Sequence, residues 1–244
     1  MKLLIIGDVH TKFEKAERIC QKFEKDYKII FVGDYFDQFN DTPLLNFETA
    51  EWLQHSLHQP NRIHLRGNHD ECYDPRVNTF CSGFSVSKKK KINEVLTIED
   101  WDKLKYFHFE NDWWFSHAGL TMEWFADPSF NLIEESYIEK IINDSIIKQQ
   151  IGNYDNCIWA SDYDRGGNYR IGGILWCDWS NLDNIPYIKQ VVGHTPVMHI
   201  NVIEHKTISS INVNVDCSSS GVYHSECLEI DENSHYSIIN TSTI

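Results

Sequence analysis

The sequence is poor in basic residues. It has 22 Lys and Arg residues against 36 Asp and Glu residues, which gives a formal net charge of −14. Only six of the basic residues are Arg, at positions 18, 62, 66, 76, 165 and 170. Nonspecific nucleic-acid binding requires a basic surface that neutralises phosphates. The composition therefore argues against a nonspecific nucleic-acid-binding protein, although a local basic groove stays open.

Long apolar runs and paired cysteines are also missing. No apolar run approaches the ~20 residues of a membrane-spanning helix. Only residues 3–7 lie between Lys2 and Asp8, and the apolar core of a secretory signal is longer, at about 7–15 residues. The seven cysteines form no C-x-x-C pair, so neither a disulfide framework nor a cysteine zinc site is indicated. We expect a cytoplasmic protein with no membrane partner.

The pattern of apolar residues is typical of an α/β fold. Short apolar runs at 2–6, 28–32 and 61–65 alternate with helical spacing at 12–25 and at 47–57. This alternation predicts parallel strands joined by right-handed crossovers. Further apolar runs predict a helix and six more strands; the helix is at 131–148 and the strands are at 113–116, 187–192, 197–203, 211–215, 226–230 and 235–239. We expect one domain over residues 1–244, with insertions at 71–110 and 121–175.

Five of the expected strands are followed by residues that can bind a metal. The sequences after the first three are Gly7-Asp8-Val9-His10, Gly33-Asp34-Tyr35-Phe36-Asp37 and Gly67-Asn68-His69-Asp70, and later runs lead to His117 and His194. The carboxyl ends of parallel strands line the ligand crevice of an open α/β sheet. One Gly-Asp pair is usually a turn, and one His is usually structural. Five such signals in order favour a metal site, and mixed carboxylate and imidazole ligands suit Mn, Fe or Zn.

These motifs resemble the calcineurin-like metallophosphoesterases, whose pattern is D-x-H, G-D-x-x-D, G-N-H-(D/E), a later His, and G-H. The resemblance covers residues 8 to about 196 and is strongest for the phosphoprotein phosphatases, through Leu65-Arg66-Gly67-Asn68-His69-Asp70 and His117-Ala118-Gly119. The symmetric dinucleoside polyphosphate hydrolases are also similar. The resemblance implies two mixed β-sheets in a sandwich flanked by helices.

The resemblance also implies the roles of individual residues. One divalent metal ion would be held by Asp8, His10 and Asp34, and a second by Asp34, Asn68, His117 and His194. The metals are expected to be Mn, with Fe, Zn or Ni as alternatives. A metal-bridging hydroxide would attack phosphorus, His69 would protonate the leaving oxygen, and Asp37 would orient His69.

Several positions depart from the patterns of this superfamily, and Pro196 among them favours the phosphatase branch. Gln38 stands where a phosphate-binding Arg is usual, and Gln brings no charge. Only Arg165 and Arg170 lie in the interval that holds a second such Arg, so we take Gln38, Arg165 and Arg170 as candidate substrate contacts, with surface ion pairs as the alternative for the two Arg residues. Pro196 replaces a His ligand of other superfamily members, and Thr11 replaces a Gly.

The expected function is therefore dinuclear-metal-dependent phosphoester hydrolysis, acting on a small molecule, a nucleotide or a phosphoprotein. A nucleotide or dinucleoside polyphosphate hydrolase is the main alternative to a phosphomonoesterase, and exposed aromatic residues such as Tyr35, Trp176 or Trp179 would favour it. A non-catalytic binding module on the same fold is a second alternative. A nuclease is disfavoured by the acidic balance.

A few other residues are interpreted as structural. The Lys run at 88–91 is expected to be a solvated face, Arg66 is expected to brace the site, and Cys72 and Cys81 can lie close together.

Overall fold

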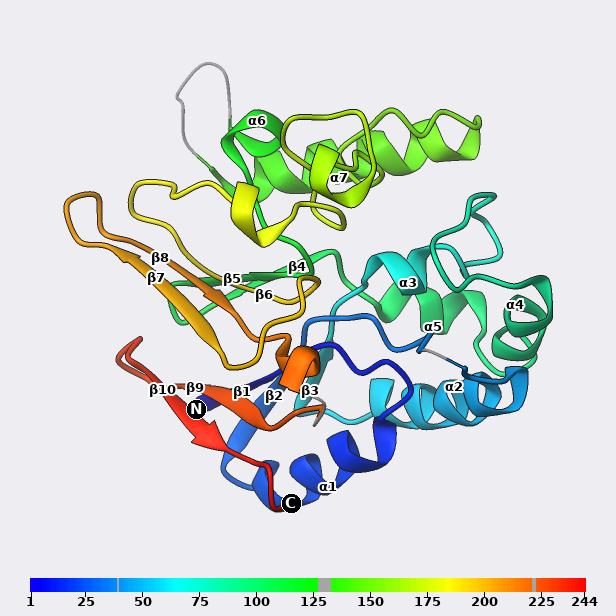
Figure 1. Ribbon diagram of the computed structural model, residues 1–244, viewed down its shortest axis with the longest axis horizontal. Helices are drawn as coiled ribbons and strands as arrows, with labels where there is room; N and C mark the ends of the chain where they lie inside the picture. The colour runs from blue at the N-terminus through cyan, green and yellow to red at the C-terminus, as the bar shows by residue number, and fades with distance from the viewer. Residues whose placement is uncertain (39, 127–132, 221–222) are drawn as a thin grey trace.

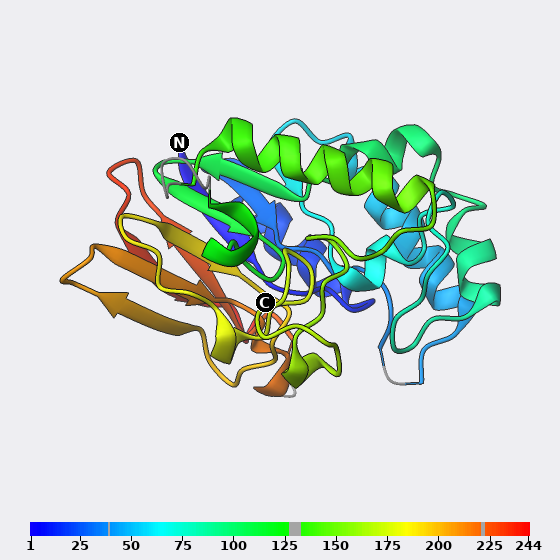
Figure 2. The ribbon, with the colours of Figure 1, turned by 90° about the horizontal axis from the view of Figure 1, so that it is seen from above.

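Two five-stranded sheets lie face to face, and helices cover their outer faces (Figure 1; Figure 2). The computed structural model describes residues 1–38, 40–126, 133–220 and 223–244. The first sheet contains β1 (Lys2–Ile6), β2 (Tyr27–Phe31), β3 (Arg62–His64), β9 (Glu226–Ile230) and β10 (Tyr236–Asn240), in the order β10-β9-β1-β2-β3. The second contains β4 (Phe107–Glu110), β5 (Trp113–Ser116), β6 (Lys189–Val192), β7 (Asn201–His205) and β8 (Ser210–Asn214), in the order β4-β5-β6-β8-β7. The expected α/β sandwich of two mixed sheets is confirmed.

Each sheet contains three neighbouring parallel strands and two antiparallel ones. Strands β1, β2 and β3 are parallel, whereas β9 runs antiparallel to β1 and β10 antiparallel to β9. In the second sheet β5, β6 and β8 are parallel, and β4 and β7 run antiparallel to their neighbours. Strand β4 was not expected from the sequence, because this edge strand is only partly buried and its residues show no clear alternation. The parallel strands bring their carboxyl ends together.

Period-two alternation in the strands builds two separate apolar cores. Leu3 and Ile5 of β1 point between the two sheets, where they join a cluster that includes Phe115 of β5. Leu4 and Ile6 point to the other side and join a cluster with residues of the first two helices. Because both faces of β1 are buried, the strand reads as a continuous apolar run.

Two long helices cover the first sheet, and a third lies over the second sheet (Figure 1). The helices α1 (Phe13–Phe23) and α2 (Pro43–Leu57) pack on the first sheet, and Thr42 caps α2 by accepting a hydrogen bond from the backbone N–H of Leu45. The helix α7 (Glu135–Gln150) begins later than the expected 131–148, of which residues 131–132 lie outside the described residues. No helix among the described residues is long and apolar enough to span a bilayer.

The short helices lie in the connections between the longer elements. The region 71–110 holds α4 (Val86–Ile92), α5 (Ile98–Lys103) and β4, and α4 packs against α2. The remaining short elements are α3 (Asn68–Glu71), α6 (Met122–Phe125), η1 (Tyr163–Arg165), η2 (Trp179–Asn181) and η3 (Cys217–Ser220). The stretch 152–173, expected as a long loop, contains no helix or strand besides η1 in the described chain.

Candidate metal centre

The ends of five parallel strands place the expected metal ligands together. Asp8 follows β1, Asp34 follows β2, Asn68 follows β3, His117 follows β5 and His194 follows β6. Three groups of possible ligand atoms form among the described residues, each with its atoms within 4.8 Å of one another. Two of them contain the expected ligands and are Asp8, His10 and Asp34, and Asp34, His117 and His194, whereas the third is Asp37, His69 and Cys81. Asp34 belongs to both groups of expected ligands, which is the position that a bridging carboxylate requires.

His117 and His10 direct an unprotonated ring nitrogen toward these groups. The Nδ1 of His117 lies 2.9 Å from the carbonyl oxygen of Val32 and donates to it, because a carbonyl can only accept. The Nε2 of His117 then carries the lone pair and lies 3.4 Å from Asp34 Oδ2. His10 follows the same rule, with its Nδ1 against the carbonyl of Asp37 at 2.6 Å and its Nε2 3.8 Å from Asp34 Oδ2. Carbonyl partners of this kind fix the tautomer of metal-binding histidines.

The second group converges on one point. The Nε2 of His117 lies 2.9 Å from Asn68 Oδ1 and 3.2 Å from the Nδ1 of His194. Several electron-pair donors that face one another this closely in a buried site can share one cation. The donor set of carboxylate, amide oxygen and imidazole therefore fits a divalent metal ion.

The charges of the cluster perturb its pKa values strongly. Burial raises the pKa of Asp8 well above its usual range, and the neighbouring Asp216 and Asp34 raise it further. Burial also opposes ionisation of Asp34, but His117 and His69 outweigh it and lower the pKa of Asp34. Perturbed carboxylates of this kind are typical of functional sites, where a bound cation replaces protons.

Asp70 locks two of the ligand-bearing loops together. Its Oδ2 accepts hydrogen bonds from the backbone N–H groups of Asp34 and Gly67, both at 2.8 Å, and its Oδ1 accepts from that of Tyr35 at 2.8 Å. Asp70 is completely buried, and burial followed by the charge of Asp34 raises its pKa to about 7. The sequence motif contained this residue but did not indicate its role, because its partners are backbone groups of another loop.

Close backbone approach explains the glycine beside Asn68. A Cβ atom on Gly67 would lie 2.0 Å from Asp34 Oδ1 and 2.5 Å from the backbone nitrogen of Asp34. Neither atom can move without displacing Asp34, so only glycine fits here. Four site residues also adopt the left-handed region; they are His10 (φ 42°), Asp34 (φ 51°), Asp37 (φ 62°) and His194 (φ 65°). Such strain concentrates at functional sites.

His69 and Asp37 form the expected pair beside the metal groups. The Nδ1 of His69 lies 3.0 Å from Asp37 Oδ2, and the rings of His69 and His10 are 5.4 Å apart. Burial alone would lower the pKa of His69, but Asp34 and Asp37 raise it above its usual value. The other oxygen of Asp37 accepts from the hydroxyl of Tyr73 at 2.7 Å and from Nζ of Lys88 at 2.8 Å.

The interpretation of residues 88–91 as a solvated face is wrong for Lys88 and Lys89. Lys88 is only 7% exposed and also lies 2.5 Å from Asp41. Lys89 donates to the backbone carbonyls of Cys72 and Val77. Packing of α4 on α2 turns this end of the helix inward, and four identical lysines in sequence carry no signal of which one is buried.

The candidate substrate contacts lie in different places. Arg165 reaches the edge of the second metal group, with Nη2 3.4 Å from the carbonyl of His194 and Nε 2.9 Å from Asp178. Arg170 is mostly exposed and pairs with Glu123 at 3.0 Å. Gln38 is half-buried directly after Asp37 and lines a groove with Thr11. The structure therefore brings Arg165 and Gln38, but not Arg170, to the site.

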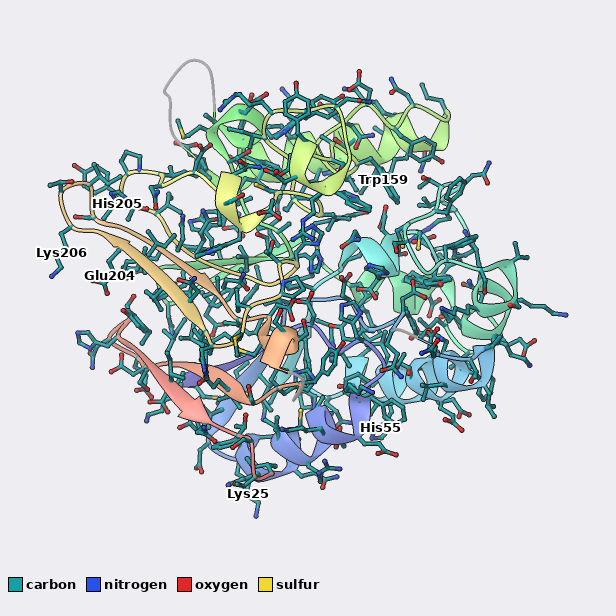
Figure 3. The ribbon with its side chains drawn as sticks, in the orientation of Figure 1. Lys25, His55, Trp159, Glu204, His205 and Lys206 are labelled. Atoms are coloured by element: carbon teal, nitrogen blue, oxygen red, sulfur yellow. The ribbon has the colours of Figure 1, made fainter. Side chains whose placement is uncertain are left out.

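Other residues around the site differ in how well the sequence indicated them. Asp216 lies two residues beyond β8, is buried, and has one carboxylate oxygen with no hydrogen-bond partner among the described residues. Its position directly after the apolar run at 211–215 is the sequence feature that could have indicated Asp216 as a site residue. Tyr35 is fully buried and cannot stack on a substrate, whereas the half-buried Trp176 has its ring 6.0 Å from that of His194. Figure 3 shows Trp159, whose ring is 6.1 Å from that of Trp176, on the side of the α7 region that faces α3.

Fold and site together define a metal-dependent hydrolase. The sequence matches the calcineurin-like phosphoesterase family over residues 1–198, and the chain belongs to this family. The resemblance that its motifs indicated is thereby confirmed. No curated protein matches the sequence.

Solved structures with the same fold include two kinds of enzyme. A protein serine/threonine phosphatase from Saccharomyces cerevisiae with similarity to human phosphatase PP5 has a TM-score of 0.50 and 15% identity, over 98% of this chain and 80% of that chain. A putative diadenosine tetraphosphatase has a TM-score of 0.52 and 12% identity, over 98% of this chain and 93% of that chain. Similarity at this identity extends to the fold alone.

Proposed function

We propose that the protein hydrolyses phosphate esters at a two-metal centre held by Asp8, His10, Asp34, Asn68, His117 and His194. The observation that carries this proposal is the membership of Asp34 in both ligand groups. A carboxylate placed between two cations offsets their mutual repulsion, and it does so only where the cations are a few ångströms apart. Two separate structural metals would not require a common ligand.

Each residue of the centre has a defined task. When bound, the metal ions would lower the pKa of a water so that it can lose a proton and serve as the nucleophile, and they would supply positive charge for the phosphoryl oxygens. Asn68 contributes a neutral oxygen, which keeps the centre from becoming too anionic to admit a phosphate. His69 donates a proton to the leaving oxygen, and Asp37 holds the imidazole through its hydrogen bond at 3.0 Å. Arg165, beside His194, contributes positive charge at the edge of the site.

The ligand chemistry also favours a particular metal and compartment. Carboxylate, amide oxygen and imidazole form a mixed set that suits Mn²⁺, with Fe, Zn or Ni as alternatives. The sulfur atoms of Cys72 and Cys81 lie 3.1 Å apart without a disulfide bond between them. Seven scattered cysteines without a C-x-x-C pair favour a reducing compartment, so we propose a cytoplasmic location.

Nucleotide hydrolysis is the second candidate function. Trp176 is half-buried with its ring 6.0 Å from that of the candidate ligand His194. An aromatic ring at this distance can stack on a base while the phosphate lies at the metals. The absence of an Arg at position 38 points the same way, because it removes the charged contact that grips a phosphomonoester.

The test compares substrates on metal-stripped protein supplied with Mn²⁺. The panel contains p-nitrophenyl phosphate, bis-p-nitrophenyl phosphate, a phosphopeptide, diadenosine tetraphosphate and a cyclic nucleotide. We expect turnover that depends on Mn²⁺ and falls about 10²–10⁴-fold in His69→Asn. We expect Asn68→Ala to bind fewer than two metal ions per chain in elemental analysis. His58→Asn is the matched control, because His58 is exposed and outside the site.

Each outcome has a definite meaning. Turnover that is lost in His69→Asn supports phosphoester hydrolysis, and the preferred substrate chooses between a phosphomonoesterase and a nucleotide hydrolase. Two bound metal ions with no turnover on any substrate would contradict hydrolysis of these classes. If no metal bound, the ligand assignment would be wrong, and the non-catalytic binding module would take its place.

A further inference from the structure

A cluster of positive charge lies at the start of α1, next to the metal centre. Lys12, Lys15 and Arg18 are three residues apart and therefore share one face of the helix. None of the three forms an ion pair with a described residue, whereas Arg62, 66, 76, 165 and 170 all do. In a chain with a formal net charge of −14, unpaired cations on one face favour an anionic ligand.

The cluster borders a groove that adjoins the site. The groove has a volume of about 340 Å³, within the range of small-molecule sites. Thr11, which directly follows the ligand His10, and Gln38, which directly follows Asp37, form its inner wall; the full lining is Thr11, Lys12, Phe13, Glu14, Lys15, Arg18, Gln38, Leu45 and Glu48. The two carboxylates in this set, on Glu14 and Glu48, are exposed. Three cations against two exposed carboxylates leave the groove net positive.

Thr11 supplies a separate sign of a missing partner. It is only 5% exposed, and its hydroxyl has no hydrogen-bond partner among the described residues. A buried hydroxyl without a partner destabilises the folded chain. Thr11 also has a φ of 62°, which is unfavourable for a β-branched residue. Glycine would relieve both costs, so a hydroxyl at this position is expected to serve a ligand.

The helix itself adds further attraction for an anion. Helix α1 has 11 residues and begins without a side-chain cap at Lys12. The N–H groups of an uncapped first turn and the positive end of the helix dipole both favour an anion. Lys12 also lies over the ring of Tyr223 at 5.7 Å, and that ring is 6.3 Å from the ring of His10. Lys12 is therefore linked through Tyr223 to the candidate metal ligand His10.

We propose that this groove binds a second phosphate group of the substrate, one that the substrate carries in addition to the phosphorus attacked at the metals. The proposal rests on the proposed function and narrows it to substrates with two or more phosphates. Where the second phosphate belongs to the leaving group, water adds to the attacked phosphorus and the P–O bond to the leaving phosphate breaks. That phosphate then departs with the bonding electron pair. The second phosphate binds in the groove, where the cations of α1 supply the positive charge that an Arg at position 38 would otherwise bring.

The test removes two charges from the groove. In Lys15→Met/Arg18→Met, we expect the affinity of the metal-free protein for inorganic pyrophosphate, measured by calorimetry, to fall about tenfold or more. Thr11→Gly, which keeps the charges, should weaken pyrophosphate binding by a smaller factor without lowering the melting temperature. The control is Lys22→Met/Lys25→Met, which removes the same charge from the last turn of α1 and from the turn that follows it; Figure 3 shows Lys25 at the lower edge of the molecule.

Kinetics on the Mn²⁺-loaded protein distinguish the possible sources of the second phosphate. The arms are tripolyphosphate, fructose 1,6-bisphosphate and p-nitrophenyl phosphate. We expect the ratio of KM for the preferred two-phosphate substrate to KM for p-nitrophenyl phosphate to rise about tenfold in Lys15→Met/Arg18→Met and to stay constant in the control. A rise with tripolyphosphate alone identifies a phosphoanhydride chain, and a rise with the bisphosphate alone identifies two separate esters.

Two results would overturn the proposal. Pyrophosphate that fails to bind the wild-type protein, or that binds Lys15→Met/Arg18→Met as tightly as wild type, shows that the groove is not an anion site. Failure of the proposed function looks different. In that case no substrate is turned over, while pyrophosphate binding to the metal-free protein still depends on Lys15 and Arg18.

Discussion

The ammonium group of Lys88 lies 2.8 Å from Oδ1 of Asp37, the residue whose other oxygen holds His69. Lys88 comes from α4, in a region outside the motifs, and also contacts Asp41 and the carbonyl of Gly83. Asp37 is therefore fixed from both sides. A helix that carries no metal ligand sets the orientation of the proposed acid pair.

Replacing Lys88 should impair proton donation more than it impairs the metal centre. In Lys88→Met, Asp37 loses a charged partner and holds His69 less firmly. We expect kcat to fall about 10–100-fold for alkyl phosphates, whose leaving groups need a proton, and only a few-fold for p-nitrophenyl phosphate. Lys88→Arg should restore part of the loss. Steady-state kinetics over a series of leaving groups provide the measurement.

Lys90 supplies a matched control for Lys88. It lies two residues away on the same helix, is exposed, and forms no ion pair with a described residue. Lys90→Met should leave kcat unchanged for every leaving group. An equal fall of kcat for alkyl and p-nitrophenyl phosphates in Lys88→Met would show that Lys88 supports the fold rather than the acid pair.

Arg66 should be essential for stability, in agreement with its interpretation as a brace. It is 4% exposed and bonds to Glu71 at 2.7 Å and to Asp74 at 3.0 Å, both of them buried carboxylates. Arg66→Met leaves Glu71 without a charged partner and Asp74 with Arg76 alone, and it should lower the free energy of unfolding by about 3–5 kcal/mol. Urea denaturation measures this loss.

The exposed Arg170 provides the comparison. Its side chain is 73% exposed and pairs with Glu123, so Arg170→Met should cost less than about 1 kcal/mol. If both variants unfolded at the same urea concentration, the buried pairs of Arg66 would contribute no more than a surface pair, and its role as a brace would be refuted.

Gly67→Ala should reduce metal binding. The added methyl group would lie 2.0 Å from Asp34 Oδ1, so Asp34 must move away from both ligand groups. We expect elemental analysis to find fewer than two Mn²⁺ ions per chain. Gly166→Ala is the control, because its added methyl group meets no atom within 4 Å, even though Gly166 has a positive φ of 76°. Full metal occupancy in Gly67→Ala would contradict the shared position of Asp34.

The sequence predicted which candidate ligands lie together, because their positions follow from chain order alone. Each of Asp8, Asp34 and Asn68 follows an apolar run, and parallel strands necessarily bring such positions to one edge. Lys88 could not be predicted in this way. Its burial depends on how α4 packs against α2, and such packing depends on many side chains at once.

Strand β4 and the backbone contacts of Asp70 could not be predicted from the sequence either. Strand β4 lies at the edge of its sheet, where partial exposure removes the alternation that marks a strand. The partners of Asp70 are main-chain groups of a loop 35 and 36 residues away, which no side-chain pattern records. The groove beside Thr11 likewise depends on α1, α2 and the loop after β2 meeting at one place.

His64 should make the protein less stable in acid. Its ring is buried between Tyr35 and Ser56, whose hydroxyls each lie 2.9 Å from one ring nitrogen. Burial, followed by the charge of Arg62, lowers the pKa of His64 to about 3. The unfolded chain, with an ordinary pKa near 6.5, then binds a proton that the folded chain excludes. This contribution to stability is complete above about pH 6.5 and is lost as the pH falls toward 3, by about 1.4 kcal/mol per pH unit.

Unfolding free energies measured between pH 7 and pH 4 test this expectation. His64→Gln cannot take up the proton, so its stability should fall less steeply with pH than that of wild type, whatever its stability at pH 7. The similarly buried His224, whose pKa burial and Lys15 lower to about 3, supplies part of the slope that remains. His205→Gln is the control, because His205 lies exposed at the end of β7 (Figure 3). Equal slopes in wild type and His64→Gln would show that the folded chain accommodates a charged His64.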